Sequence, residues 1–335
     1  MKKYVNLFVF VFMIGACLSQ GRAQTKSAVS YKNPVVDIAM PDPTVIKAAD
    51  GYFYVYATES TRNVPIMKSK DLVEWTYCNT AFTNKTRPRF EPKAGIWAPD
   101  INYINGKYVL YYAMSVWGGE QTCGIGVATA NSPQGPFTDH GKMFRSNEIG
   151  VQNSIDPSLL QYEGRNYLVW GSFRGIYVIE LTTDGLSIMP GAKKKRIAGT
   201  AFEAVYIHKY GDYYYMFASI GSCCQGVKST YKVVVGRSKK VWGPYKDKTG
   251  KPMLKNGYSL VIGANDHFVG NGHGSQIIRD DAGQDWLLYH GFLRSTPENG
   301  RILLLDQIKW DQEGWPYVEG GSPSYETQKA PVFNN

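Results

Sequence analysis

The chain has few charged residues and no sign of helical organisation. Only 19% of its 335 residues are Asp, Glu, Lys or Arg, and no segment has the pattern of a convincing amphipathic helix. Aromatic residues make up 14%, with 24 Tyr, and there are 35 Gly. Aromatic and β-branched side chains suit strands, and glycine suits the tight turns that join them. We therefore expect an all-β protein.

A Pro- or Ser-rich linker is also missing from the middle of the chain. Two β-sandwiches in tandem would need such a break, so one domain is favoured. We expect it to span residues 31–326, after a short tether at 24–30 and before a C-terminal tail at 327–335.

The long apolar run needed for a membrane-spanning helix is absent from the N-terminus. Lys2 and Lys3 precede a short apolar stretch, residues 5–13, followed by small residues. This pattern is typical of a signal peptide. Cleavage after Ala23 would release a soluble protein, whereas a lipobox ending at Cys17 would leave a lipid anchor; both stay open. Either way we expect an extracytoplasmic protein: periplasmic, secreted or lipid-anchored.

Positive charge is in excess but is not concentrated. The formal charge is +9, and removing Lys2, Lys3 and Arg22 with the leader lowers it to +6. The densest basic run is 193–196, which we interpret as a solvated loop with, at most, weak attraction to acidic cell-wall polymer. We expect no nucleic-acid partner, membrane contact only through a lipid anchor, and a monomer.

Cysteine is scarce, with five residues, and none has the spacing of a zinc site. Export permits a disulfide. Cys223 and Cys224 are adjacent, however, and could pair with each other only through a strained ring. We therefore expect buried or semi-buried thiols.

One strand-like pattern recurs five times along the chain. It begins with a turn residue and continues with aromatic and apolar residues: GYFYVYAT, GKYVLYYA, GRNYLVWGS, GDYYYMFAS and QDWLLYHG. Successive copies start 55, 58, 47 and 73 residues apart. Each repeat has the length of one small antiparallel sheet, and five such sheets predict a five-bladed β-propeller.

An ionisable residue stands shortly before each repeated strand. In a propeller the first strand of every blade lines the central channel, so we expect these residues to form a ring at one mouth: Asp42, Asp100, Asp156, Glu203 and His273. A single Asp-Pro is usually a turn starter. Recurrence at one repeat position favours function instead, because crowded acids push their pKa values apart, as acid–base chemistry requires.

The motifs around three of these acids resemble glycoside hydrolase family 43. The resemblance is carried by MPDPTVI, NSIDPSLL and FEAVYIHK, with WAPDI and WDQEGWP in agreement, and covers nearly all the chain after the leader. It implies a five-bladed propeller. SCCQGVKSTYKVVVGRSKKVWGPY and GNGHGSQI are similar to the family's arabinan-cleaving, endo-acting members. Departures include Ala204-Val205 and Arg174, where relatives often carry Gly-Pro and an aromatic.

The resemblance implies inverting hydrolysis of internal α-1,5 bonds in plant cell-wall arabinan or arabino-oligosaccharides. Asp42 would be the general base, Glu203 the general acid, and Asp156 the group that tunes Glu203. It also implies a calcium ion near His273, held largely by waters. Candidate substrate contacts are Trp97, Asp100, Asn153, Ser154, Ser172 and Phe173.

Two alternatives remain at this point. An exo-acting α-L-arabinofuranosidase or β-xylosidase of the same family would carry the same acids in a closed pocket. A non-catalytic glycan-binding propeller would have no reason to retain Asp42, Asp156 and Glu203.

Overall fold

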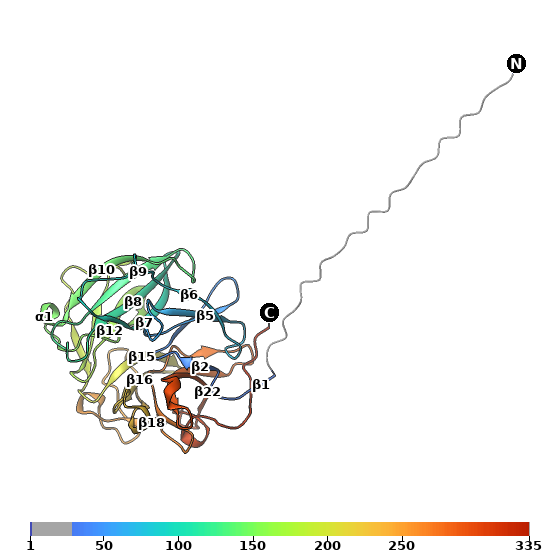
Figure 1. Cartoon of the computed structure of the whole chain (residues 1–335). Coiled ribbons are helices and arrows are strands. Elements are labelled where there is room, and N and C mark those ends of the chain that lie inside the picture. Colours follow the sequence, from blue (N-terminus) through green and yellow to red (C-terminus); the bar gives the residue numbers. More distant parts are fainter. Residues whose placement is uncertain (2–28, 335) are drawn as a thin grey trace.

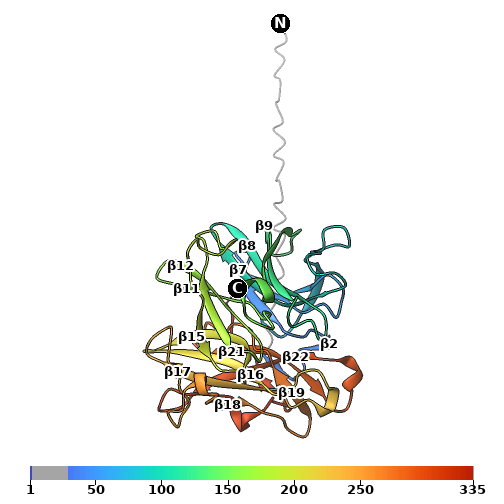
Figure 2. The ribbon, with the colours of Figure 1, turned by 90° about the vertical axis from the view of Figure 1, so that its left-hand side faces the viewer.

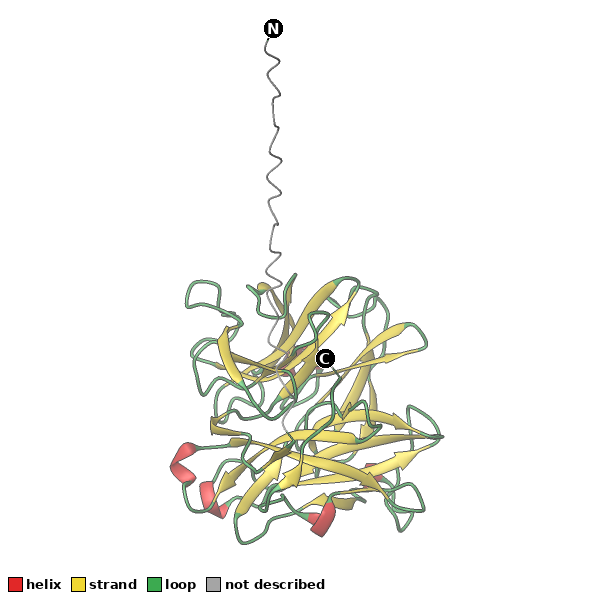
Figure 3. Ribbon diagram, turned by 90° about the vertical axis from the view of Figure 1, so that its right-hand side faces the viewer, coloured by secondary structure: helices red, strands yellow, loops and turns green. Residues whose placement is uncertain are grey.

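The computed structural model describes Met1 and residues 29–334. The predicted leader beyond Met1, including Cys17, and most of the tether at 24–30 lie outside the described residues. Within the described part, no helix is long and apolar enough to cross a membrane. Strands dominate the molecule, and the few helical segments are short and peripheral (Figure 3).

Five antiparallel sheets follow one another along the chain and around a common centre, which confirms the predicted propeller (Figure 1). Blade 1 contains β3 (Thr44–Lys47), β4 (Phe53–Tyr56), β5 (Pro65–Ser69) and β6 (Thr76–Thr80). Blade 2 contains β7 (Gly95–Ile104), β8 (Lys107–Ser115), β9 (Gly124–Ala130) and β10 (Thr138–Arg145). Blade 3 contains β11 (Ser158–Tyr162), β12 (Arg165–Trp170), β13 (Ile176–Glu180) and β14 (Lys195–Ala198).

Blade 4 contains β15 (Glu203–Tyr210), β16 (Tyr213–Ile220), β17 (Lys232–Ser238) and β18 (Ser259–Ile262). Blade 5 contains β19 (Phe268–Gly272), β21 (Asp285–Leu293), β22 (Ile302–Trp310) and β2 (Val36–Ala39), with β20 (Ile278–Arg279) and β23 (Pro316–Tyr317) at its margins. The helical segments are α1 (Ser146–Ile149), η1 (Gly226–Lys228), η2 (Met253–Lys255), η3 (Pro297–Asn299) and η4 (Glu319–Gly321).

The two ends of the propeller domain meet in the ring. β2 comes from the N-terminal side yet forms the outer strand of blade 5 by pairing with β22. β1 (Ser30–Tyr31) pairs with β24 (Gln328–Lys329), and the C-terminus lies beside β1 (Figure 1). Ala330 and Phe333 are buried. The segment predicted as a tail is therefore packed against the propeller.

The hydrophobic core lies between the blades. The recurring pattern supplies the second strand of each blade: β4, β8, β12, β16 and β21. β4, for example, is buried along its whole length, as expected for a strand covered on both faces. Blade 2 lies across the molecule from blades 4 and 5 (Figure 2). The segments that lead into the first strand of each blade converge at the centre.

Candidate active site

Five residues with left-handed backbone stand at equivalent positions, one at the entrance to each blade. Their φ values lie between 42° and 55°, and they are Asp42, Ala98, Asp156, Ala204 and His273. This conformation is uncommon for residues other than glycine, so its recurrence marks a shared turn that aims the neighbouring side chains at the axis. The turn brings Asp42, Asp156 and His273 together, as the sequence predicted.

The sequence prediction assigned two residues, Asp100 and Glu203, to ring positions that they do not occupy. Ala98 and Ala204 hold the ring positions in blades 2 and 4. Glu203 precedes its ring position by one residue and still lines the cleft. Asp100 follows its ring position by two residues, together with its equivalents Thr44, Ser158, Tyr206 and Ser275, and lines a small cavity further along the axis.

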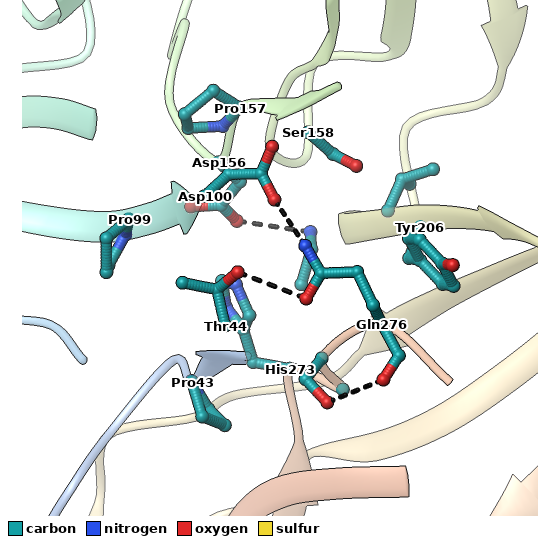
Figure 4. Close-up of a pocket in the computed structure, with 14 residues that line it drawn as sticks. Pro43, Thr44, Pro99, Asp100, Asp156, Pro157, Ser158, Tyr206, His273 and Gln276 are labelled. Atoms are coloured by element: carbon teal, nitrogen blue, oxygen red, sulfur yellow. Dashed lines mark hydrogen bonds between the residues drawn. The ribbon is translucent and has the colours of Figure 1, made fainter. Parts of the chain in front are cut away.

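Asp100 is consequently not a cleft residue. Its carboxylate accepts hydrogen bonds from Gln276 Nε2 (2.7 Å), Asn102 Nδ2 (2.7 Å) and the Leu159 backbone N–H (2.7 Å). Figure 4 shows the Gln276 amide between Asp100 and Thr44. Burial raises the pKa of Asp100 to about 7. These contacts join blades 1, 2, 3 and 5. Asp100 was expected to contact substrate, but it stabilises the packing of the blades instead.

The cleft itself opens above the ring. All five blades contribute to its lining, which includes Asp42, Trp97, Trp117, Asn153, Asp156, Ser172, Phe173, Glu203, Cys223, Cys224, His273 and Arg301. Ser154 is not among these residues. It is fully buried, where its hydroxyl donates to Val151 O and accepts from Trp170 Nε1, so its predicted contact with substrate is also corrected.

Asp42 is surrounded by groups that favour its charged form. Arg301 Nη1 lies 2.7 Å and His273 Nδ1 lies 3.2 Å from Asp42 Oδ1, while Thr58 Oγ1 donates to Oδ2 at 2.6 Å. Burial alone would raise the pKa of this carboxyl, but Arg301 and His273 hold it well below its usual range. Asp42 is thus an ionised carboxylate, in the state that a general base needs.

His290 holds the backbone of Asp42 in place. Its Nδ1 accepts the Asp42 backbone N–H at 3.0 Å, so the ring is neutral with its proton on Nε2. Burial, reinforced by Arg301, keeps the pKa of His290 well below its usual range. Burial also acts to lower the pKa of His273, but the charge of Asp42 outweighs it and raises that pKa.

Glu203 has the opposite environment. Its side chain is 8% exposed, and burial raises the pKa of its carboxyl although Ser172 Oγ donates to Oε2 at 2.5 Å and the Tyr231 hydroxyl also bonds it. Asn153 Nδ2 in turn donates to Ser172 Oγ at 2.9 Å. This chain of hydrogen bonds fixes the orientation of a carboxyl whose raised pKa favours the protonated form that a general acid needs.

Asp156 couples to this acid. Burial and the nearby charge of Glu203 raise the pKa of Asp156 to about 8, and its Oδ2 accepts the Ala204 backbone N–H at 3.1 Å. Two buried acids that repel one another share a proton rather than both ionising. Asp156 therefore lies where its charge state depends on that of Glu203, and its tuning role stays a prediction.

Aromatic faces line the blade 2 side of the cleft. The rings of Trp97 and Trp117 are 5.4 Å apart, and Trp117 is 78% exposed. Flat apolar faces of this kind suit sugar rings. Trp117 was not predicted, although its place directly after the repeated strand of blade 2 could have indicated it. Arg301, Thr58, Tyr231 and His290 were also missed.

The expectation of free thiols at Cys223 and Cys224 was wrong. The two residues form a disulfide with each other in the loop between β16 and β17, at the edge of the cleft. The Thr230 backbone N–H closes this loop by donating to Ser222 O at 3.0 Å, which keeps both sulfurs in one exposed turn. Cys78 and Cys123 are free, and Cys123 is buried.

A directly bound calcium ion does not fit the residues near His273. Calcium takes six to eight oxygen ligands, but the described part of the chain holds no cluster of three or more His, Cys, Asp or Glu able to bind a metal. Asp100, one of the carboxylates that line the axial cavity, already accepts three hydrogen bonds. An ion at this place would need a shell made of water.

Known proteins are similar to this chain over most of its length. The family model described as Glycosyl hydrolases family 43 matches residues 31–316. The chain is 37% identical over 290 residues to an extracellular endo-α-(1→5)-L-arabinanase of Bacillus subtilis, covering 82% of this chain and 86% of the relative. It is 36% identical over 307 residues to an extracellular exo-α-(1→5)-L-arabinofuranosidase of Cellvibrio japonicus, covering 83% and 86%.

Solved structures give the same result. A Cellvibrio cellulosa α-L-arabinanase in complex with arabinohexaose has a TM-score of 0.77 at 33% identity, covering 85% of this chain and 96% of that one. A Bacillus licheniformis endo-arabinanase has a TM-score of 0.74 at 32% identity, covering 87% and 100%. The chain belongs to glycosyl hydrolase family 43.

Proposed function

We propose that this protein is an exported arabinanase that hydrolyses internal α-1,5-L-arabinofuranosidic bonds. The observation that carries the proposal is the contrast between two carboxyl groups in one cleft: Arg301 lowers the pKa of Asp42, and burial raises the pKa of Glu203. An ionised base and a protonated acid are what glycoside hydrolysis requires. Related proteins that act on α-1,5-arabinan support the choice of substrate.

The proposed reaction uses the two carboxyls on opposite sides of the scissile bond. Asp42 removes a proton from an attacking water, and the protonated Glu203 donates to the leaving oxygen. The bond between the anomeric carbon and that oxygen breaks as the bond to water forms, so the configuration inverts. Asp156 then shares the charge that Glu203 acquires, and solvent returns the proton.

Product analysis tests this proposal. With linear, debranched 1,5-α-arabinan we expect oligosaccharides of intermediate length before arabinose accumulates. Arabinose alone from the first time point would show exo action, as in the Cellvibrio relative, and no cleavage of arabinan or arabinoxylan would favour a glycan-binding protein. We further propose a signal peptide at 1–23 with export to the periplasm or exterior, with or without a lipid at Cys17.

An ion pair at the cleft edge is expected to influence product length. Arg174 Nη2 contacts both carboxylate oxygens of Glu120, at 3.0 and 2.7 Å, and so joins a blade 2 loop to a blade 3 loop. Arg174→Ala should shift early products toward longer oligosaccharides, because this edge of the cleft opens. Arg165→Ala, which breaks the exposed pair with Glu180, is the matched control. An unchanged product distribution in Arg174→Ala would contradict this role.

Calcium stays a proposal, as an ion held mainly by waters near His273. We expect treatment with a chelator, followed by dialysis, to lower both activity and the melting temperature, the latter by roughly 2–4 °C for each kcal/mol of stabilisation lost. Calcium should restore both, whereas magnesium should not, because it demands a smaller octahedral shell. Identical melting curves and rates before and after chelation would rule the ion out.

A further inference from the structure

The face of the propeller opposite the cleft carries a basic, aromatic hollow between blades 3 and 4. The residues that line it include Tyr162, Lys195, Lys209, Tyr214, Lys240 and Trp242. A neighbouring hollow shares Lys195 and Trp242 with it and adds Lys193. We call the two hollows together the basic groove.

The basic groove is separate from the active site. Asp156 lies two residues before β11, and Glu203 is the first residue of β15, whereas Tyr162 and Lys209 lie at or near the far ends of these same strands. Strands of five to eight residues span roughly 16–26 Å at about 3.3 Å per residue. A ligand in the groove would therefore not meet the acids, although one long polymer could reach both faces.

Charge in the groove is strongly one-sided. Five exposed lysines line it: Lys193, Lys195, Lys209, Lys239 and Lys240. Its lining acids are Asp212 and Glu180, and Glu180 is paired with Arg165. The ion pairs found among the described residues include none of these five lysines. Clustered ammonium groups without acidic partners attract anionic ligands.

Aromatic rings give the groove a second recognition element. Trp242 packs edge-on against Tyr167 and Tyr162, with centroids 4.6 and 5.9 Å apart, and Tyr162 packs against Tyr214 at 6.0 Å. Trp242, Tyr162 and Tyr214 are each partly exposed. Ring faces accommodate the apolar side of a sugar, and lysines placed around them suit its carboxylates.

We propose that the basic groove is a second polysaccharide-binding site, which takes a chain bearing uronic acid units. The combination of aromatic rings and ammonium groups without acidic partners favours carboxylated sugar over neutral glycan. The groove would hold the enzyme on an acidic polysaccharide while the cleft acts on arabinan. This ligand assignment rests on the proposed function for its context, but binding itself does not depend on catalysis.

The test measures binding and hydrolysis separately. Affinity electrophoresis of the whole protein in gels containing polygalacturonate should show retardation that weakens with salt. Lys239→Glu/Lys240→Glu should weaken the apparent Kd by about tenfold or more, as expected when paired attractions become repulsions. Lys85→Glu/Lys107→Glu makes the same change in net charge outside the groove and should bind like the unmodified protein. Trp242→Ala should also weaken binding while net charge stays constant.

Hydrolysis of a short, soluble arabino-oligosaccharide should be unchanged in the groove variants, which separates this proposal from the catalytic one. Equal loss of retardation in both double variants would overturn the site, because it would show a general charge effect. Retardation by duplex DNA or a sulfated polymer as strong as that by polygalacturonate would overturn the uronate assignment. Absence of retardation in the unmodified protein would also overturn it.

Discussion

Glu203→Gln should lower kcat on linear arabinan by about 10²–10⁴-fold, the usual contribution of general acid catalysis. The amide keeps the shape of the side chain and can still accept the hydrogen bond from Ser172, but it cannot protonate the leaving oxygen. We therefore expect KM and the melting temperature to change little. Initial rates, measured as reducing ends released, test the expectation. Near-normal turnover in the folded variant would contradict it.

The leaving group distinguishes the acid from the base. A dinitrophenyl arabino-oligosaccharide needs no protonation as it departs, so Glu203→Gln should cleave it at a rate close to that of the unmodified enzyme. Asp42→Asn removes the base and should be slow on both substrates. Asp266→Asn, an exposed surface acid outside the cleft lining, serves as the control. Equal losses for Glu203→Gln on both substrates would remove its assignment as the acid.

Arg301→Gln should move the acidic limb of the pH–rate profile to higher pH. Burial alone would raise the pKa of Asp42, and Arg301, 2.7 Å away, is the largest influence that lowers it. Without the guanidinium the base is protonated over a wider range, so activity at pH 5 should fall much more than activity at pH 8. The measurement is kcat/KM against pH, with Arg294→Gln, an exposed arginine, as control.

Arg301→Gln should also lower the free energy of unfolding. The pKa of Asp42 is lowered in the folded protein, so its ionisation stabilises the fold above the ordinary carboxyl pKa, and this contribution disappears as pH falls through the lowered value. Removing one partner of a buried pair typically costs about 3–5 kcal/mol, and Asp42 retains His273 and Thr58, so we expect the lower end. A pH profile identical to the unmodified enzyme would show that Arg301 does not set the state of Asp42.

The blades could be predicted because each repeats a strand that is apolar on both faces. β4, β8 and β12 are buried along most of their lengths, and a continuous run of aromatic and apolar residues in the sequence indicates such burial. The closure of the ring could not be predicted in the same way. β2 is only four residues long with two of them exposed, and its pairing with β22 joins segments almost the whole chain apart.

The alignment error at Asp100 has a local cause. Counting from the next repeated strand places Asp100 beside Asp42, although the connecting strands differ in length and β7 carries a bulge between Trp97 and Asp100. The prolines were the better guide. Pro43, Pro99 and Pro157 each follow a ring residue directly, which puts Ala98, not Asp100, in the ring.

The residues that set the protonation states were beyond this kind of sequence analysis. Arg301 lies between β21 and β22, and Tyr231 directly precedes β17, so neither stands at the repeated position. Both reach the site because the blades converge. Gly272 permits this approach: a Cβ there would lie 2.1 Å from the ring of Tyr231, which bonds Glu203. Such contacts depend on packing between blades, which no local pattern encodes.

The central claim is that the surroundings of Asp42 and Glu203 determine which carboxyl acts as the base and which acts as the acid. It is tested most directly by the pH dependence of kcat/KM for a dinitrophenyl arabino-oligosaccharide and for the matching unactivated oligosaccharide. On the unactivated substrate the profile should be bell-shaped. On the activated substrate the alkaline limb, which reports the proton shared by Glu203 and Asp156, should disappear, while the acidic limb of Asp42 remains. An alkaline limb that persists on the activated substrate, or an acidic limb that vanishes, would contradict the assignment.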